Sequence, residues 1–273
     1  MAVLSVDLAY RRWSDLGIVI LDRKAAAISC EIIPSTATGL DADHAGGPID
    51  PNILAGRLNH LCGVRGIRII VLDGPQAWKS NANGCLHARL SERQLNTAAK
   101  TGLPGMVKPG PYRPFAEFCL DVYDGLCRRG WRRLDTQTRP GMHHDHIDQY
   151  ANTNLDAQRI LIESYPHAAW KSLGLKPLPA KRRARVSDLA EAYHGLNCLV
   201  PISTTRPPNH DQLQAIVGGL PGLAIEENNA ADARIVGNPP RREDGHWREG
   251  FIVLPLPPHS AEFAQFPDKM PSA

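Results

Sequence analysis

Short apolar runs of strand length open the chain, and polar segments separate them. Residues 2–8, 16–22 and 25–33 are three such runs with short connections, so we predict an antiparallel meander of three strands. Apolar residues then recur at helical spacing over 49–61, which predicts a crossover helix. The nearly unbroken β-branched run 67–72 follows, and this pattern is typical of a strand buried on both faces.

The crossover helix determines how the fourth strand pairs. A strand reached through a helix normally runs parallel to its partner, so we expect 67–72 to lie beside 2–8. The carboxyl ends of neighbouring parallel strands face one crevice, and these two strands end close to Asp7 and Asp73. Two carboxylates would then share one site.

The later part of the chain is predicted to be mainly helical. An amphipathic helix is expected over 113–130, a fifth strand over 159–163 and a last strand over 251–254. No internal repeat or domain linker is evident, so we expect a single domain over 1–273. Its loop insertions and its extended tail are expected over about 36–49, 134–157 and 255–273.

Composition and charge exclude several classes of protein. The formal net charge of +3, from 31 basic and 28 acidic residues, is far from that of a dedicated nucleic-acid coat, so any polyanion site must be local. No run approaches the roughly 20 apolar residues of a membrane helix, and no signal-peptide pattern opens the chain, so we expect a cytoplasmic protein. The six cysteines form no C-x-x-C pair, which suggests neither a zinc ribbon nor a disulfide framework.

The two expected strand-end carboxylates suggest metal chemistry. Like charges on Asp7 and Asp73 would repel, and the usual remedies are a raised pKa or a bound divalent cation. Magnesium or manganese is favoured if Glu163 and Asp211 join them, because oxygen ligands suit these ions and such sites hydrolyse phosphodiesters. Each acid has an alternative: Asp73 starts a good turn, Asp211 could cap a helix and Glu163 could form a salt bridge.

Five stretches of the chain resemble domain-of-unknown-function family 429, whose members are regarded as predicted nucleases of the ribonuclease H-like fold. They are Ser5–Ala9, Leu72–Pro75, Glu163–Pro166 with Trp170 and Leu173–Gly174, His210–Asp211 with Gln214–Ala215, and Glu249–Ile252. The resemblance implies an α/β fold with a five-stranded mixed sheet in the order 3-2-1-4-5, flanked by helices. It also implies a metal site that a carboxylate from a late helix closes, which here is Asp211. Some relatives carry a second acid where this chain has Gln214, so one or two metal ions remain alternatives.

Cationic side chains elsewhere in the chain are candidates for contacts with phosphate. They are Arg11, Arg12, Lys181, Arg182, Arg185 and His210. A solvated helix face is an equal alternative for 181–185. For Trp13, packing in the core is favoured over a surface on which a base could stack.

One histidine-rich segment resembles a zinc motif. Residues 142–149, with His143, His144 and His146, are similar to the H-x-H-x-D-H pattern of metallo-β-lactamase-like hydrolases. Gln149 replaces the last histidine of that pattern, so a polar loop is favoured.

These observations lead to one main hypothesis and two alternatives. The main hypothesis is a nuclease that depends on Mg²⁺ or Mn²⁺, with Asp7, Asp73, Glu163 and Asp211 as catalytic and metal-binding residues and nucleic acid as partner. The first alternative is an ATP-binding phosphotransferase of the actin-like superfamily, although the chain is short for its two lobes. The second is a non-catalytic nucleic-acid-binding or assembly protein. The substrate and the oligomeric state stay open.

Overall fold

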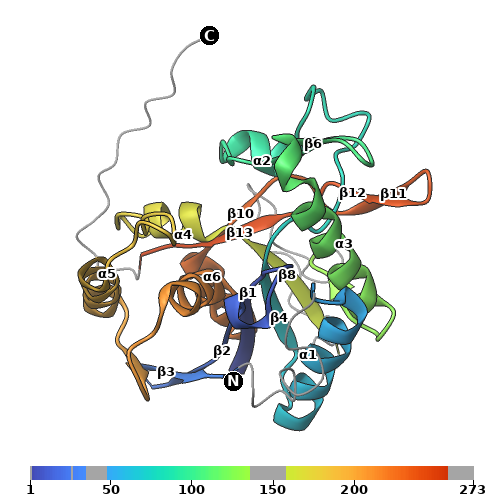
Figure 1. Cartoon of the computed structure of the whole chain (residues 1–273). Helices are drawn as coiled ribbons and strands as arrows, with labels where there is room; N and C mark the ends of the chain where they lie inside the picture. Colours follow the sequence, from blue (N-terminus) through green and yellow to red (C-terminus); the bar gives the residue numbers. More distant parts are fainter. Residues whose placement is uncertain (1, 26, 35–47, 136–157, 258–273) are drawn as a thin grey trace.

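A mixed sheet forms the centre of the structure, and helices cover both of its faces (Figure 1). The structure is a computed structural model that describes residues 2–25, 27–34, 48–135 and 158–257. Most of the expected loop insertions and tail, and all of the zinc-like segment 142–149, lie outside these residues. None of the helices in the described ranges combines the length and the apolar character that a membrane span requires.

The first three strands form the expected antiparallel meander. They are β1 (Ala2–Asp7), β2 (Gly17–Lys24) and β3 (Ala27–Ile32). A short turn of helix, η1 (Trp13–Asp15), joins β1 to β2, and the indole of Trp13 packs in the core. The preference for core packing at this position is confirmed.

Helix α1 (Pro51–Arg65) carries the chain from the meander to the fourth strand. The Asp50 carboxylate accepts a hydrogen bond from the backbone N–H of Asn52 and caps the first turn. Gly66 ends the helix in the left-handed conformation, which glycine adopts without strain. The next strand, β4 (Ile69–Asp73), therefore enters the sheet parallel to β1, as the crossover predicted.

The central strands have the order of the ribonuclease H-like fold. The expected fifth strand is β8 (Ile160–Ser164), which lies parallel beside β4. The order β3-β2-β1-β4-β8 is the 3-2-1-4-5 order, so the predicted fold is confirmed. The sheet is wider than expected, with nine strands in the described residues. The four further strands are β7 (Arg132–Arg133), β9 (Ile202–Thr204), β10 (Ala233–Val236) and β13 (Ile252–Pro255). Of these, β13 confirms the last strand predicted over 251–254, and the other three were not expected.

The chain between β8 and β13 is less helical than the pattern predicted. It contains α4 (Pro166–Ser172), α5 (Val186–Leu199) and α6 (His210–Glu226), but also β9, β10 and a separate hairpin, β11 (Arg241–Glu243) with β12 (His246–Arg248). These strands have only three or four residues each and lie at sheet edges or in the hairpin. No sustained alternation of apolar and polar residues marks these strands, so the pattern missed them, although helices are the main regular structure between β8 and β13.

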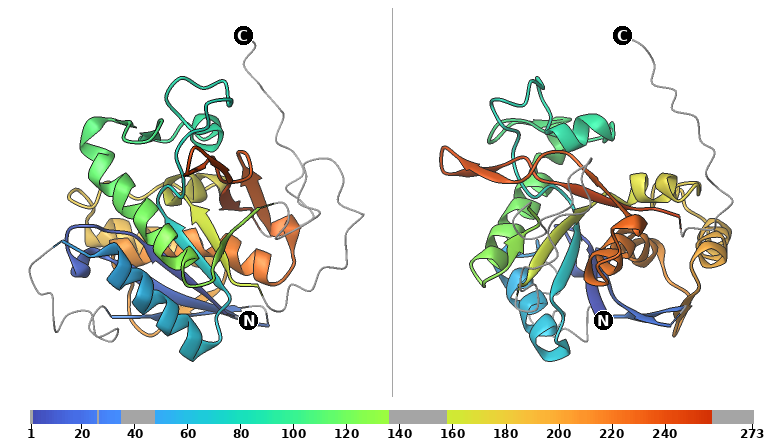
Figure 2. Two further views of the ribbon diagram at one scale, coloured as in Figure 1. Left: turned by 90° about the vertical axis from the view of Figure 1, so that its right-hand side faces the viewer. Right: turned by 180° about the vertical axis from the view of Figure 1, so that it is seen from behind.

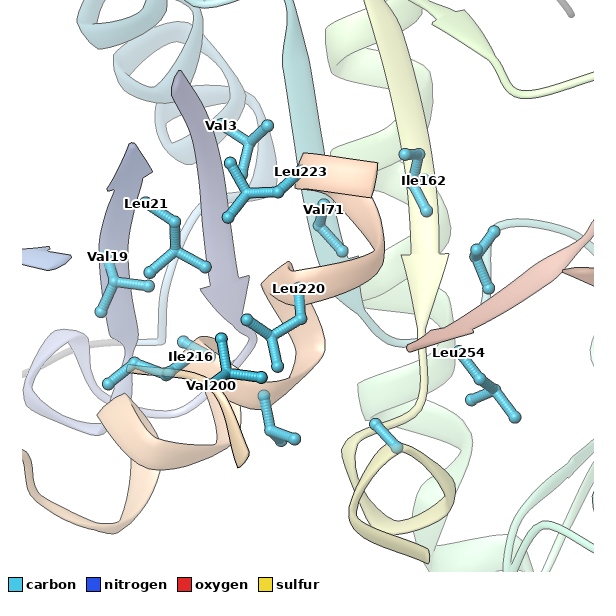
Figure 3. Packing of buried hydrophobic residues seen from close by; sticks show 14 of the residues in the cluster. Val3, Val19, Leu21, Val71, Ile162, Val200, Ile216, Leu220, Leu223 and Leu254 are labelled. Atoms are coloured by element: carbon cyan, nitrogen blue, oxygen red, sulfur yellow. The ribbon is translucent and has the colours of Figure 1, made fainter. Parts of the chain in front are cut away.

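Helices pack on both faces of the sheet and bury a separate apolar cluster on each face. Figure 3 shows Ile216, Leu220 and Leu223 of α6 against strands β1, β2 and β4. Helices α1 and α3 (Arg113–Cys127) cover the opposite face and lie side by side (Figure 2). The helices therefore leave the carboxyl ends of β1 and β4 as the place where a crevice can form.

Glycines allow α6 to lie unusually close to the sheet. A methyl group at Gly219 would lie 2.7 Å from the Cβ of Ser5, and one at Gly222 would lie 2.5 Å from Val71. The Ser5 hydroxyl also donates a 2.7 Å hydrogen bond to a backbone carbonyl of α6. These contacts fix the helix along the sheet and bring its first turn, which carries Asp211, to the end of β1.

The segment between β4 and α3 forms a lobe at the carboxyl ends of β4 and β8 (Figure 1). Its elements are α2 (Leu90–Gln94), β5 (Lys100–Thr101), β6 (Val107–Lys108) and η3 (Gly110–Tyr112). The lobe walls one side of the region where the strand-end acids lie.

Candidate active site

Two carboxyl groups face each other at the carboxyl ends of β1 and β4. Asp7 and Asp73 are partners in the parallel register, so their side chains lie on the same face of the sheet. The two groups are hydrogen-bonded to each other, and both residues keep part of their surface exposed to solvent. The structure therefore places these two acids side by side, as strand adjacency predicted.

The surroundings of the pair favour its protonated form. Burial, and then the charges of Asp73 and Asp211, raise the pKa of Asp7 well above its usual range, while Lys181 opposes the shift. Burial raises the pKa of Asp73 to about 7, although its hydrogen bond with Asp7 lowers it. Because each carboxyl group affects the charge of the other, the two groups titrate as a pair.

Asp211 approaches the pair from the first turn of α6. Asn209, rather than Asp211, caps this helix, since the Asn209 side chain accepts a hydrogen bond from the backbone N–H of Gln212. Residue 17, the register partner of Asp7, is a glycine because a methyl group there would lie 2.1 Å from the Asp211 carbonyl oxygen. The missing side chain lets the start of α6 lie directly against β2, beside the register partner of Asp7.

The Asp211 carboxylate has a cationic partner. The ammonium group of Lys181 lies 2.5 Å from Asp211 and 2.9 Å from Asp15, so it bridges the first turn of α6 and η1. These two hydrogen bonds raise the pKa of Lys181 although partial burial lowers it. Lys181 therefore stands as a positive charge next to the acid pair.

Glu163 is buried, and a cation and a backbone amide hold its carboxylate. Arg89 donates to its two oxygens at 2.7 and 2.5 Å, and the backbone N–H of Gln76 donates at 3.0 Å. Glu163 lies one residue out of register with Asp73, which pairs with Ser164, so its side chain starts on the other face of the sheet. Its salt bridge matches the alternative considered for this residue.

A buried set of charged side chains connects β8 to the lobe, and no sequence pattern predicted most of it. Arg89 also binds Glu92 at 3.1 Å. Glu249 is fully buried and accepts hydrogen bonds from the backbone N–H of Ser80 and Leu90 at 2.8 and 2.9 Å. The resemblance to family 429 includes Glu249, but its hydrogen-bond partners lie about 160 residues earlier in the chain. Only the folded chain shows that these residues hold the lobe in place.

Gln214, which replaces the second acid of some relatives, points to the core. Its side-chain oxygen accepts a 2.8 Å hydrogen bond from the indole N–H of Trp170. It therefore takes part in the packing of α6 against α4.

Arg11 and Arg12 follow β1 and are exposed. The Arg11 guanidinium lies 5.2 Å from the centre of the Tyr10 ring, and Arg12 binds Asp15 at 2.9 Å. Both residues lie close along the chain to Asp7. Their contact with phosphate stays a prediction.

The other candidate cations lie near the start of α6 or on the turn before α5. Arg182 and Arg185 are exposed on that turn. The imidazole of His210 is held between two acceptors, with Nε2 3.0 Å from the Pro179 carbonyl and Nδ1 3.4 Å from Asp211. His210 thus borders the same carboxylate as Lys181.

The carboxylate oxygens at this site suit a hard divalent cation, but too few of the predicted acids are free to bind one. No group of three or more His, Cys, Asp or Glu side chains is arranged to hold a metal ion in the described parts of the chain. Asp211 is paired with Lys181, and Glu163 with Arg89. Asp7 and Asp73 remain, and a cation between them would relieve the repulsion that raises the pKa of Asp7.

No family model matches the chain, and no curated protein matches its sequence, so the resemblance to family 429 stays a prediction. The structure of RuvC from Thermus thermophilus is 9% identical, with a TM-score of 0.38, and the match covers 84% of this chain and 98% of that chain. The same protein in complex with a Holliday junction substrate is 8% identical, with a TM-score of 0.35 and the same coverage. The fold assignment therefore rests on the strand order.

Proposed function

We propose that this protein is a metal-dependent nuclease that cleaves a phosphodiester at Asp7 and Asp73. The observation that carries the proposal is the in-register pairing of these two acids at the carboxyl ends of parallel strands. Both have a raised pKa, which is typical of a site prepared for catalysis or for a cation. A Mg²⁺ or Mn²⁺ ion held there would offset the negative charge of the phosphate and activate water.

The residues around the pair have separate roles in this proposal. Asp7 and Asp73 would hold the cation, and Asp211 would supply a further oxygen in competition with its ion pair to Lys181. The Lys181 ammonium, which stands beside these acids, would offset the charge of the phosphate. Glu163 acts through Arg89 as a positioning residue that keeps the lobe against β8.

Cleavage assays with matched variants test the function. Single-stranded and duplex DNA, RNA, a hybrid and a branched junction are incubated with the protein and Mg²⁺ or Mn²⁺. We expect Asp7→Asn and Asp73→Asn to lower the cleavage rate by at least about 100-fold, because each removes a charged ligand. Asp244→Asn, at a side chain 77% exposed, is the control and should cut like the wild type. Equal rates for all four proteins would refute the proposal.

A second experiment tests the role of Lys181 without relying on cleavage. Lys181→Met removes the charge that competes for Asp211, so we expect Mn²⁺ to bind several-fold more tightly in a calorimetric titration. Lys24→Met, at an exposed position at the far end of β2, is the control. Unchanged or weaker Mn²⁺ binding in Lys181→Met would show that Lys181 does not compete with the ion.

A further inference from the structure

A cavity of about 230 Å³ lies directly beside Asp73. The end of β4, from Asp73 to Pro75, and the end of β8 form one side of it, and the lobe between β4 and α3 forms the other. Any polymer whose phosphate reaches the acid pair therefore has this cavity within reach of the neighbouring nucleotide.

Aromatic side chains line the cavity. Tyr112, Phe115 and Tyr165 all contribute to its wall. Tyr165 directly follows β8, and its hydroxyl forms a hydrogen bond with the backbone of Ala98. Burial and the charge of the nearby Asp73 raise the pKa of Tyr165, while the hydrogen bond opposes this shift. The Tyr165 ring is thus held next to the acid pair.

The aromatic surface continues towards β1. The ring of Phe115 lies 6.3 Å from that of Tyr10, centre to centre, and Tyr10 is three residues beyond Asp7. Tyr112 stands at the solvent side, with 44% of its surface exposed. Rings of this kind offer faces on which a base can stack.

The charges in the wall argue against a phosphate as the occupant. Arg89 is neutralised by Glu163 and Glu92. The ammonium of Lys100 donates to the backbone carbonyls of Thr97 and Glu92 at 2.5 and 3.1 Å. Both cations that line the cavity are therefore already engaged with protein groups and are not free to bind a phosphate.

The lobe that forms the wall is fixed before any ligand arrives. The buried Arg89 ties α2 to β8, and the Glu92 carboxylate accepts a 2.8 Å hydrogen bond from the backbone N–H of Thr101 in β5. A preformed, ring-lined cavity of this size suits a flat group that carries polar atoms at its edge.

We infer that this cavity receives one unstacked nucleobase of a single-stranded or locally opened nucleic acid, next to the phosphate at Asp7 and Asp73. The inference rests on the proposed function for the position of the phosphate. The base stacks on the aromatic wall, and backbone groups of residues 97–101 lie at its edge. Paired bases in an intact duplex are stacked on both sides and cannot enter.

Binding and cleavage of single-stranded DNA test the inference. A short oligodeoxynucleotide is prepared with one abasic nucleotide, placed at each position in turn. We expect one position to raise the Kd, and the KM of cleavage, by roughly 5- to 100-fold, because the stacked base is lost. Tyr112→Ala should raise both values for the intact strand and remove the penalty of the abasic site, while Tyr112→Phe should behave like the wild type. Met106→Ala is the control, since Met106 is exposed on the same lobe but does not line the cavity.

The outcomes separate this inference from the proposed function. If the wild type cleaves, but no abasic position or Tyr112 variant changes Kd or KM, the cavity does not hold a base. If nothing is cleaved, but one abasic position weakens binding and Tyr112→Ala removes the effect, the base site stands without the nuclease. If neither binding nor cleavage depends on a base, the inference is wrong.

Discussion

Replacing Asp73 with asparagine should stabilise the metal-free protein above neutral pH. Burial raises the pKa of Asp73 from an ordinary 3.8 to about 7, so the folded protein keeps a proton that the unfolded chain has already lost. Folding stability must then fall as the pH rises through this window. The protonated Asp73 contributes fully to folding stability below about pH 4, and this contribution is lost above about pH 7. Asparagine carries no charge and removes this dependence.

The expected gain in stability of Asp73→Asn follows from the pKa shift of Asp73. One pKa unit corresponds to about 1.4 kcal/mol, so the difference between 3.8 and about 7 sets an upper limit of roughly 4 kcal/mol. Asp73 keeps some contact with solvent and titrates together with Asp7, so we expect about half of this limit. A gain of about 2 kcal/mol corresponds to a rise in Tm of about 4–8 °C for a chain of this size.

Thermal denaturation followed by circular dichroism measures the change. With EDTA present, the Tm of the wild type should fall between about pH 5 and about pH 8, and Asp73→Asn should melt higher than the wild type only at the higher pH. The control Asp244→Asn should follow the wild type. Adding Mg²⁺ at the higher pH should raise the Tm of the wild type and leave Asp73→Asn unchanged. A wild-type Tm that does not depend on pH, or an Asp73→Asn variant that is less stable at the higher pH, would refute the reasoning.

Two further predictions concern the residues that hold the site together. Arg89→Met should lower the free energy of unfolding by about 3–5 kcal/mol in urea titrations, because it leaves Glu163 buried without its cation. Adding Glu163→Gln to this variant should recover part of the loss. A loss below about 1 kcal/mol for Arg89→Met would contradict the buried ion pair. Gly17→Ala should cost about 1–3 kcal/mol and weaken Mn²⁺ binding, since its methyl group would displace Asp211. Gly63→Ala, a helical position with no neighbour within 4 Å, is the control and should be neutral or stabilising by up to about 1 kcal/mol. Equal stabilities for the two alanine variants would show that the contact at position 17 is not restrictive.

The local pattern was sufficient to predict the core of the fold and the acid pair. Long apolar runs define β1 and β4, and the helix between them requires a parallel pairing. Given that pairing, Asp7 and Asp73 had to meet at one edge. This inference needed only the period of the side chains and the presence of a helix before β4, and both can be recognised from local sequence.

The partners of Glu163 and Asp211 could not be predicted in the same way. Arg89 meets Glu163 from 74 residues away, and Lys181 meets Asp211 from 30. Exposed arginines and lysines look the same in a sequence as buried ones. Only the packing of the folded chain decides which cationic side chains are buried and form ion pairs. It also decides which carboxylates remain free to bind a metal ion.

The sequence pattern by itself therefore determined the meander, the parallel pairing of β4 with β1 and the meeting of Asp7 with Asp73, because hydrophobic periodicity and a helical crossover are local constraints. The full order of the central strands was implied only by the resemblance to family 429. Tertiary structure alone decided the width of the sheet, the buried charges that fix the lobe, the cation on Asp211 and the aromatic cavity beside Asp73. Each of these depends on contacts between segments far apart in the chain, where geometry and desolvation, rather than residue type, select the partner.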